Sequence, residues 1–155
     1  MRNFLAVCAV ALAVGAPIPS ADADGDHHAS HADAIGTPGD AAKASRTIDV
    51  EMSDRMRFTP ANFSVRKGET IRFVVRNTGR LRHEMVLGKS SALREHAAQM
   101  SKAGPMQHEA ANELTVEPGK AGDLVWHFAR AGTVEFACLE PGHFEAGMRG
   151  TVTVR

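Results

Sequence analysis

Apolar and polar residues alternate with a period of two along most of the chain after residue 46, which predicts half-buried β-strands. The clearest run spans residues 70–77, where Ile71, Phe73 and Val75 share one face and β-branched residues are frequent. The expected strands cover residues 47–52, 63–66, 70–77, 83–87, 112–116, 123–129, 133–138 and 151–154, with a short extended piece at 56–58. About seven to eight short strands separated by turns are typical of an all-β sandwich or barrel.

One segment interrupts the strand pattern. Within residues 90–103, Leu93, Ala97 and Met100 recur at helical spacing, and Gly104-Pro105 ends the segment. The sequence therefore predicts one short helical insertion in the all-β domain.

The first 23 residues have the pattern of a secretory signal. Arg2 supplies a positive charge, an apolar run covers residues 4–16, and small residues place the cleavage after Ala21 or Ala23. A membrane anchor is the alternative, but the apolar run is shorter than the roughly 20 residues that a spanning helix needs. We therefore expect a periplasmic protein without membrane insertion, in which residues 46–155 form one domain.

Residues 24–45 contain almost no large apolar residue, so we expect a disordered arm between the signal and the domain. The arm carries His27, His28 and His31, and histidine-rich tracts of this kind commonly bind metals. The alternative is a solvated linker that happens to contain histidine.

The charge balance bears on the binding partners, and the cysteine count bears on the chemistry of the remaining thiol. The chain has 18 Lys and Arg against 18 Asp and Glu, so nothing in its charge indicates binding to nucleic acid or to an anionic membrane. Cys8 lies in the expected signal, which leaves Cys138 as the only thiol of the exported chain. A single cysteine in a secreted protein indicates intermolecular pairing, a reactive thiol or a thiolate bound to metal.

Cys138, His143 and Met148 form an evenly spaced Cys-x4-His-x4-Met motif. Soft sulfur ligands combined with imidazole favour copper over hard cations, and a blue-copper site combines one Cys with two His and a weak axial Met. The motif supplies three of these four donors. Glu140 and Glu145 in the same stretch are expected to be exposed.

The second histidine must come from elsewhere in the domain. The available side chains are His83, His96, His108 and His127. We expect His83, because it opens a strand after a turn and is distant enough in sequence to come from a different strand than Cys138. His127 falls in the middle of a strand, on the opposite face from Trp126, and is expected at the surface.

Residues 46–155 resemble the cupredoxins, the plastocyanin and azurin family of small blue-copper proteins. The resemblance rests on the Cys-x4-His-x4-Met motif, on a His after an Asn-ending strand, and on the strand Gly-Thr-Val-Glu-Phe-Ala-Cys. It implies a Greek-key β-sandwich with one type 1 copper site, in which His83, Cys138 and His143 are equatorial ligands and Met148 is axial. Many members carry Asn directly after the first His, where it ties two loops together, whereas this chain has Glu84.

The insertion and its flanks contain further soft donors that could bind additional, weakly held copper. They are Met85, His96, Met100, Met106 and His108. The alternative is that the methionines pack in the core and the histidines are solvated. The chain also resembles the CopI-type cupredoxins, which are periplasmic proteins tied to copper tolerance. The shared features are a His-Glu-Met sequence, a Met/His insertion and a His-rich N-terminus.

That resemblance implies a periplasmic copper-binding protein that serves copper tolerance by binding and redox-cycling copper. The alternative is a soluble blue-copper electron carrier. We expect copper ions as the ligand and, as a protein partner, a periplasmic redox protein or a copper exporter or oxidase. No catalytic arrangement of residues is evident, so we do not expect an enzyme, with oxidation of Cu(I) left open.

Overall fold

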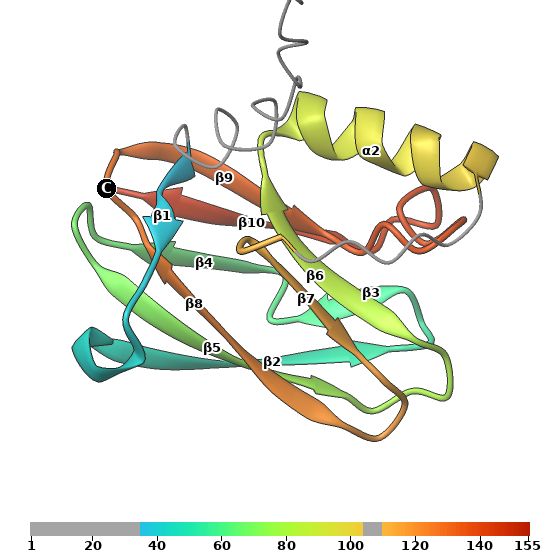
Figure 1. The fold of residues 1–155 in the computed structure, drawn as a ribbon, viewed down its shortest axis with the longest axis horizontal. Coiled ribbons are helices and arrows are strands. Elements are labelled where there is room, and N and C mark those ends of the chain that lie inside the picture. Colours follow the sequence, from blue (N-terminus) through green and yellow to red (C-terminus); the bar gives the residue numbers. More distant parts are fainter. Residues whose placement is uncertain (1–34, 104–109) are drawn as a thin grey trace, which may run out of the picture.

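The computed structural model describes residues 35–103 and 110–155, which form two five-stranded β-sheets packed face to face (Figure 1). The predicted all-β sandwich with one helical insertion is therefore confirmed. The expected signal at residues 1–23 lies outside the described residues, as do the donors His27, His28, His31, Met106 and His108.

The first sheet has the strand order β1-β8-β5-β2-β3. These strands are β1 (Thr37–Pro38), β8 (Ala121–His127), β5 (Thr70–Asn77), β2 (Arg46–Ser53) and β3 (Arg57–Thr59). Strand β5 lies at the centre, parallel to β2 and antiparallel to β8. Its side chains alternate between the core and the outer face, as the period of two predicts.

The second sheet has the order β4-β10-β9-β6-β7. These strands are β4 (Asn62–Val65), β10 (Arg149–Val154), β9 (Gly132–Ala137), β6 (His83–Gly88) and β7 (Glu113–Val116). All six residues of β6 are buried, because helix α2 (Ser90–Ala103) covers the outer face of the sheet at this strand and at β9. Strand β6 therefore passes through the interior and has no solvated face.

The space between the sheets is filled by large apolar side chains. Phe136 packs against Phe58 and Phe63, with ring centroids 5.0 and 5.3 Å apart, and Phe73 packs edge-on against Phe128. Aromatic contacts of this kind add stability beyond the burial of their area.

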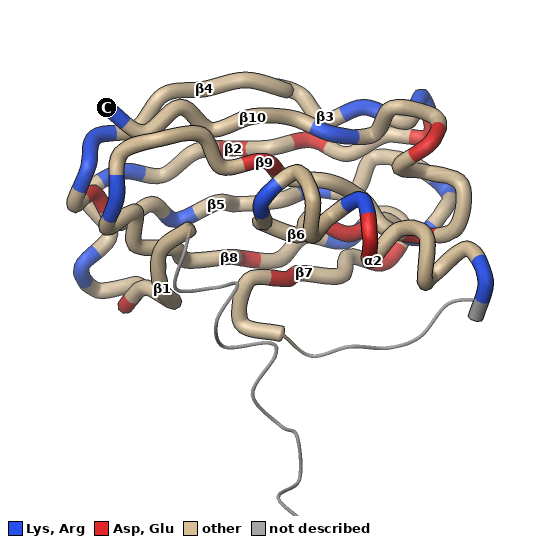
Figure 2. The backbone as a smooth tube through the Cα atoms, turned by 90° about the horizontal axis from the view of Figure 1, so that it is seen from above, with Lys and Arg blue, Asp and Glu red and all other residues tan. Residues whose placement is uncertain are grey.

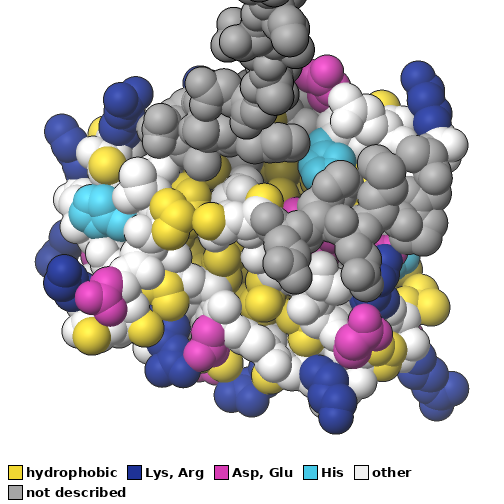
Figure 3. Space-filling view, viewed as in Figure 1, with side chains coloured by type: hydrophobic (Ala, Val, Ile, Leu, Met, Phe, Trp, Pro, Cys, Tyr) yellow, Lys and Arg dark blue, Asp and Glu magenta, His cyan; other side chains and the backbone are white. Residues whose placement is uncertain are grey.

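Lys and Arg occur with Asp and Glu at both ends of the sandwich (Figure 2), and on the face in Figure 3 charged side chains surround smaller apolar areas.

The structure differs from the sequence-based prediction at residues 35–45, which were expected to belong to a disordered arm. Thr37 and Pro38 pair with the end of β8, and a 3-10 turn follows at Ala41–Lys43. Ile35 is buried, and its carbonyl oxygen accepts a hydrogen bond from Trp126 Nε1 at 3.2 Å. The buried indole N–H requires an acceptor, which explains why this segment is held against the sandwich.

Candidate metal centre

The Cys-x4-His-x4-Met stretch forms a compact loop between β9 and β10. Its backbone is closed by two hydrogen bonds, from the Cys138 N–H to the Met148 carbonyl and from the Met148 N–H to the His143 carbonyl, both 3.0 Å long. Gly142 has a φ of 84°, a conformation that favours glycine and that turns the chain back towards the strand. The local sequence thus returns Met148 to a position beside Cys138.

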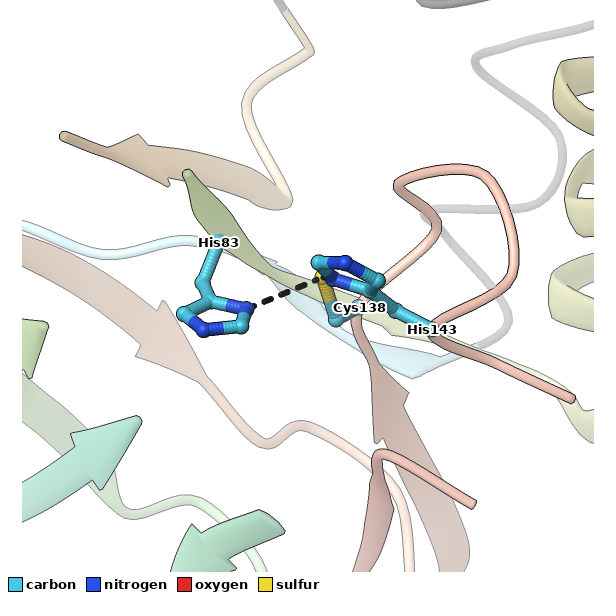
Figure 4. A group of neighbouring side chains, drawn as sticks. All are labelled: His83, Cys138 and His143. Atoms are coloured by element: carbon cyan, nitrogen blue, oxygen red, sulfur yellow. Dashed lines mark hydrogen bonds between the residues drawn. The ribbon is translucent and has the colours of Figure 1, made fainter. Parts of the chain in front are cut away.

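His83 reaches this loop from the start of β6. Strand β6 pairs with β9 in the same sheet, so the beginning of one strand lies near the end of the other. His83 is fully buried, and its Nδ1 lies 4.0 Å from Cys138 Sγ, while His143 Nδ1 lies 3.2 Å from the same sulfur. Figure 4 shows both imidazole rings directed towards the thiol.

Ligand atoms of His83, Cys138 and His143 all lie within 4.8 Å of one another. Met148 is fully buried and belongs to the same apolar cluster as Cys138. The structure therefore brings together the three predicted nitrogen and thiol donors and places the predicted thioether residue beside them. His96 on α2 and His127 on β8 are not part of this group, and the half-buried His127 contacts Thr70 Oγ1 instead.

Burial favours the uncharged forms of Cys138 and His143 before a metal binds. Burial raises the pKa of the Cys138 thiol to about 12, and burial together with the neighbouring His83 lowers the pKa of His143. A neutral imidazole is the form that binds a metal, and a cation can replace the thiol proton. One thiol, two imidazoles and a thioether in a buried site are a donor set that fits copper.

Glu84 takes the place at which the resemblance predicts an asparagine. It is 4% exposed, its Oε1 accepts the Leu139 N–H at 2.7 Å, and its own N–H donates to Cys138 Sγ at 3.4 Å. Glu84 therefore ties the strand that carries His83 to the loop that carries Cys138, which is the role that the resemblance assigns to an asparagine at this position. Burial raises its pKa to about 7, helped by the negative charge of Glu113.

The expectation that Glu140 is exposed is wrong, whereas Glu145 is exposed as predicted. The Glu140 side chain is only 12% exposed, and its Oε1 lies 2.7 Å from Arg82 Nε. Arg82 precedes His83 in the chain, and Glu140 follows Cys138 by two residues. The ion pair therefore forms a second link between the two segments that carry the ligands, a contact between distant residues that no local pattern reveals.

Two of the predicted additional copper donors are buried in apolar clusters. Met85 lies in the main core, and Met100 is 1% exposed in a cluster between α2 and the ligand loop. This cluster also contains Leu139 and Phe144, the residues that directly follow Cys138 and His143. These positions favour the packing alternative for both methionines, and they show that α2 supports the ligand loop. His96 is half-buried on α2.

The pH dependence of stability can be predicted for Glu113, whose pKa is raised from near 4.5 to about 7 by burial and by Glu140. The folded state holds this proton more tightly than the unfolded state, so the associated stability is present below pH 4.5 and is lost as the pH rises through 7. We expect Glu113→Gln to become progressively more stable than the wild type over this range, measured by urea unfolding of the metal-free protein. Glu117→Gln, at an exposed position, is the control. A difference in the free energy of unfolding between the wild type and Glu113→Gln that stays the same at every pH would contradict the prediction.

A family model for copper-binding proteins of the plastocyanin/azurin family matches residues 44–155. The chain belongs to this family. It is 51% identical over 151 residues to the copper-resistant cuproprotein CopI of Rubrivivax gelatinosus, with 92% of each chain covered. It is 38% identical to the copper-resistant cuproprotein CopI of Pseudomonas aeruginosa, with 81% of this chain and 85% of the relative covered.

Solved structures agree with this family assignment. Dithionite-reduced auracyanin from Roseiflexus castenholzii superimposes with a TM-score of 0.63 at 25% identity, covering 72% of this chain and 98% of auracyanin. Together with the family model and the CopI relatives, this establishes a copper-binding cupredoxin. Among the described residues, no helix is long and apolar enough to cross a membrane.

Proposed function

We propose that this cupredoxin is an exported copper-binding protein that serves copper tolerance, with one type 1 site formed by His83, Cys138, His143 and Met148. The observation that carries the proposal is the buried group of three donors within 4.8 Å of one another. The names of the CopI relatives support tolerance as the biological role. The signal-like pattern of residues 1–23 supports export to the periplasm.

The fold fixes the positions of the donors. His83 is held in a fully buried strand, and His143 is placed by the loop hydrogen bond from Met148. Bound copper would supply one-electron chemistry between Cu(I) and Cu(II). Because the imidazoles, the thiol and the loop are fixed by packing, the same arrangement would serve both oxidation states with little rearrangement, which supports the proposal of redox cycling at this site.

Electron transfer is the second candidate function. The observation in its favour is that His143 is half-buried, whereas His83 and Cys138 are fully buried, so the His143 ring is the point at which the site approaches the surface. For electron transfer, the partner would be a periplasmic redox protein. For copper tolerance, the partner would be a copper exporter or oxidase. Oxidation of Cu(I) would need an electron acceptor such as that redox protein, and the tolerance proposal itself requires only that the site binds copper.

Growth of a deletion strain in copper distinguishes the two candidates. We expect the strain to become copper-sensitive, with growth restored by the wild-type gene but not by Cys138→Ser. Glu145→Gln, an exposed substitution in the same loop, should restore growth as the wild type does. Unchanged copper sensitivity combined with a lower respiratory rate would contradict tolerance and favour electron transfer.

Additional copper is expected to bind to the histidine-rich stretch in residues 24–34. Copper titration of the exported chain should give more than one ion per chain, and deletion of residues 24–34 should reduce that number. The deletion ends before Ile35, because Ile35 and β1 are packed against the sandwich. A ratio of one copper per chain before and after the deletion would show that the stretch is a solvated linker.

A further inference from the structure

The turn between β2 and β3 contacts the metal centre through the carboxylate of Asp54. The two ring nitrogens of His83 have different neighbours, because Nδ1 faces Cys138 Sγ at 4.0 Å and Nε2 lies 3.2 Å from Asp54 Oδ1. The nitrogen that points away from the thiol is thus the one that Asp54 contacts. Asp54 is separated from His83 by 29 residues and is 38% exposed.

The carboxylate of Asp54 is held by the backbone of the loop that precedes His83. Its Oδ2 accepts the Arg80 N–H at 2.8 Å, and its Oδ1 accepts the Leu81 N–H at 3.2 Å. A Cβ atom at Gly79 would collide with this carboxylate, so glycine is required for the close approach. Asp54 therefore has a defined position relative to the His83 ring.

Asn77 fixes the same loop from its other side. Its Nδ2 donates to the carbonyls of Leu81 at 2.8 Å and of Val116 at 2.9 Å, and its Oδ1 accepts the Gly79 N–H at 2.9 Å. Asn77 is 2% exposed and ends strand β5. The loop, the carboxylate and the His83 ring consequently form one rigid unit.

A metal-binding histidine that donates its second ring N–H to a carboxylate is fixed in tautomer and orientation and becomes a more basic ligand. We propose that Asp54 is a positioning residue of the copper site, which keeps the His83 proton on Nε2, presents Nδ1 to the metal and favours Cu(II) over Cu(I) by its negative charge. This inference rests on the proposed copper site. A nearby negative charge stabilises the ion of higher charge, which is the physical reason for the preference.

Two substitutions separate the position of the carboxylate from its charge. Asp54→Ala removes both, so we expect Cu(II) affinity to fall about 10–100-fold, the usual cost of losing an outer partner of a metal-bound histidine. Asp54→Asn keeps one acceptor oxygen for His83 and Leu81 while losing the bond to Arg80 and the charge. We expect its Cu(II) affinity to fall less than that of Asp54→Ala and its reduction potential to rise. A tenfold change in the preference for one oxidation state corresponds to about 59 mV.

A second measurement follows the His83 ring in the metal-free protein. The nitrogen-15 chemical shifts of the ring should show a proton on Nε2 in the wild type and in Asp54→Asn, and a mixture of tautomers in Asp54→Ala. Asp49→Asn is the matched control, because Asp49 is an exposed aspartate on β2 whose ion pair with Arg76 lies outside the metal centre. It should leave affinity, potential and tautomer unchanged.

The outcomes distinguish this inference from the proposed site itself. A wild-type protein that shows no thiolate-to-copper absorption on Cu(II) loading overturns the site and this inference with it. If the wild type shows the thiolate-to-copper band, and both Asp54 variants keep its Cu(II) affinity, reduction potential and His83 tautomer, only the role of Asp54 is overturned. If Asp54→Ala does not fold, the raised potential of Asp54→Asn supports the inference, and an unchanged potential overturns it.

Discussion

Replacement of Cys138 by Ser is expected to abolish the intense visible absorption of the Cu(II)-loaded protein. The absorption arises from charge transfer between the thiolate and copper, and Cys138 is the only free cysteine among the described residues. A serine hydroxyl is a harder and more weakly binding donor, so copper affinity should fall by more than the roughly 10–100-fold caused by loss of an outer partner. Absorption spectra and a competition titration with a chelator measure the two effects.

The control for this substitution is Glu145→Gln, which changes an exposed side chain in the same loop and should leave the spectrum and the affinity intact. Folding of Cys138→Ser can be checked by circular dichroism. A folded Cys138→Ser protein that retains the visible band would show that copper binds elsewhere.

Truncation of Met100 to Ala is expected to lower the free energy of unfolding by about 2–5 kcal/mol, the usual cost of replacing a buried Met by Ala. Met100 is almost fully buried between α2 and the ligand loop, where it shares a cluster with Leu93, Leu139 and Phe144. Its removal leaves a cavity against the residues that follow Cys138 and His143. Urea unfolding of the metal-free protein measures the loss.

Met100→Leu tests whether the thioether is needed for copper or only for packing. Leucine has a similar volume, and such exchanges usually cost less than about 1.5 kcal/mol. We expect this variant to recover most of the stability and to bind the same number of copper ions as the wild type. A lower copper number in a stable Met100→Leu protein would identify Met100 as a ligand and contradict its assignment to the core.

Local patterns in the sequence predicted the elements whose periodicity is strong. Helix α2 spans Ser90–Ala103 and strand β5 spans Thr70–Asn77, both with the predicted bounds. Each has a clear apolar face and a recognisable end, at Gly104-Pro105 for the helix and Thr78-Gly79 for the strand. Strand β3 overlaps the short extended piece expected at residues 56–58, whereas β1 has only two residues and is too short to show a period.

The grouping of His83, Cys138 and His143 could also be predicted, because two of these residues share a short motif and the third opens a strand. The surrounding contacts could not. Asp54 lies in a turn 29 residues before His83, and Arg82 pairs with Glu140 across 58 residues. Ile35 is held by Trp126 across 91 residues. Such contacts depend on how the sheets and loops come together, which one sequence does not reveal.

The copper ligands are tested most directly by a crystal structure of the Cu-loaded protein with an anomalous difference map measured at the copper absorption edge. We expect a peak bonded to Cys138 Sγ and to the Nδ1 atoms of His83 and His143, with Met148 as the neighbouring axial residue. A map in which the strongest copper peak lies away from these residues, with the three side chains unbound, would contradict the proposed site.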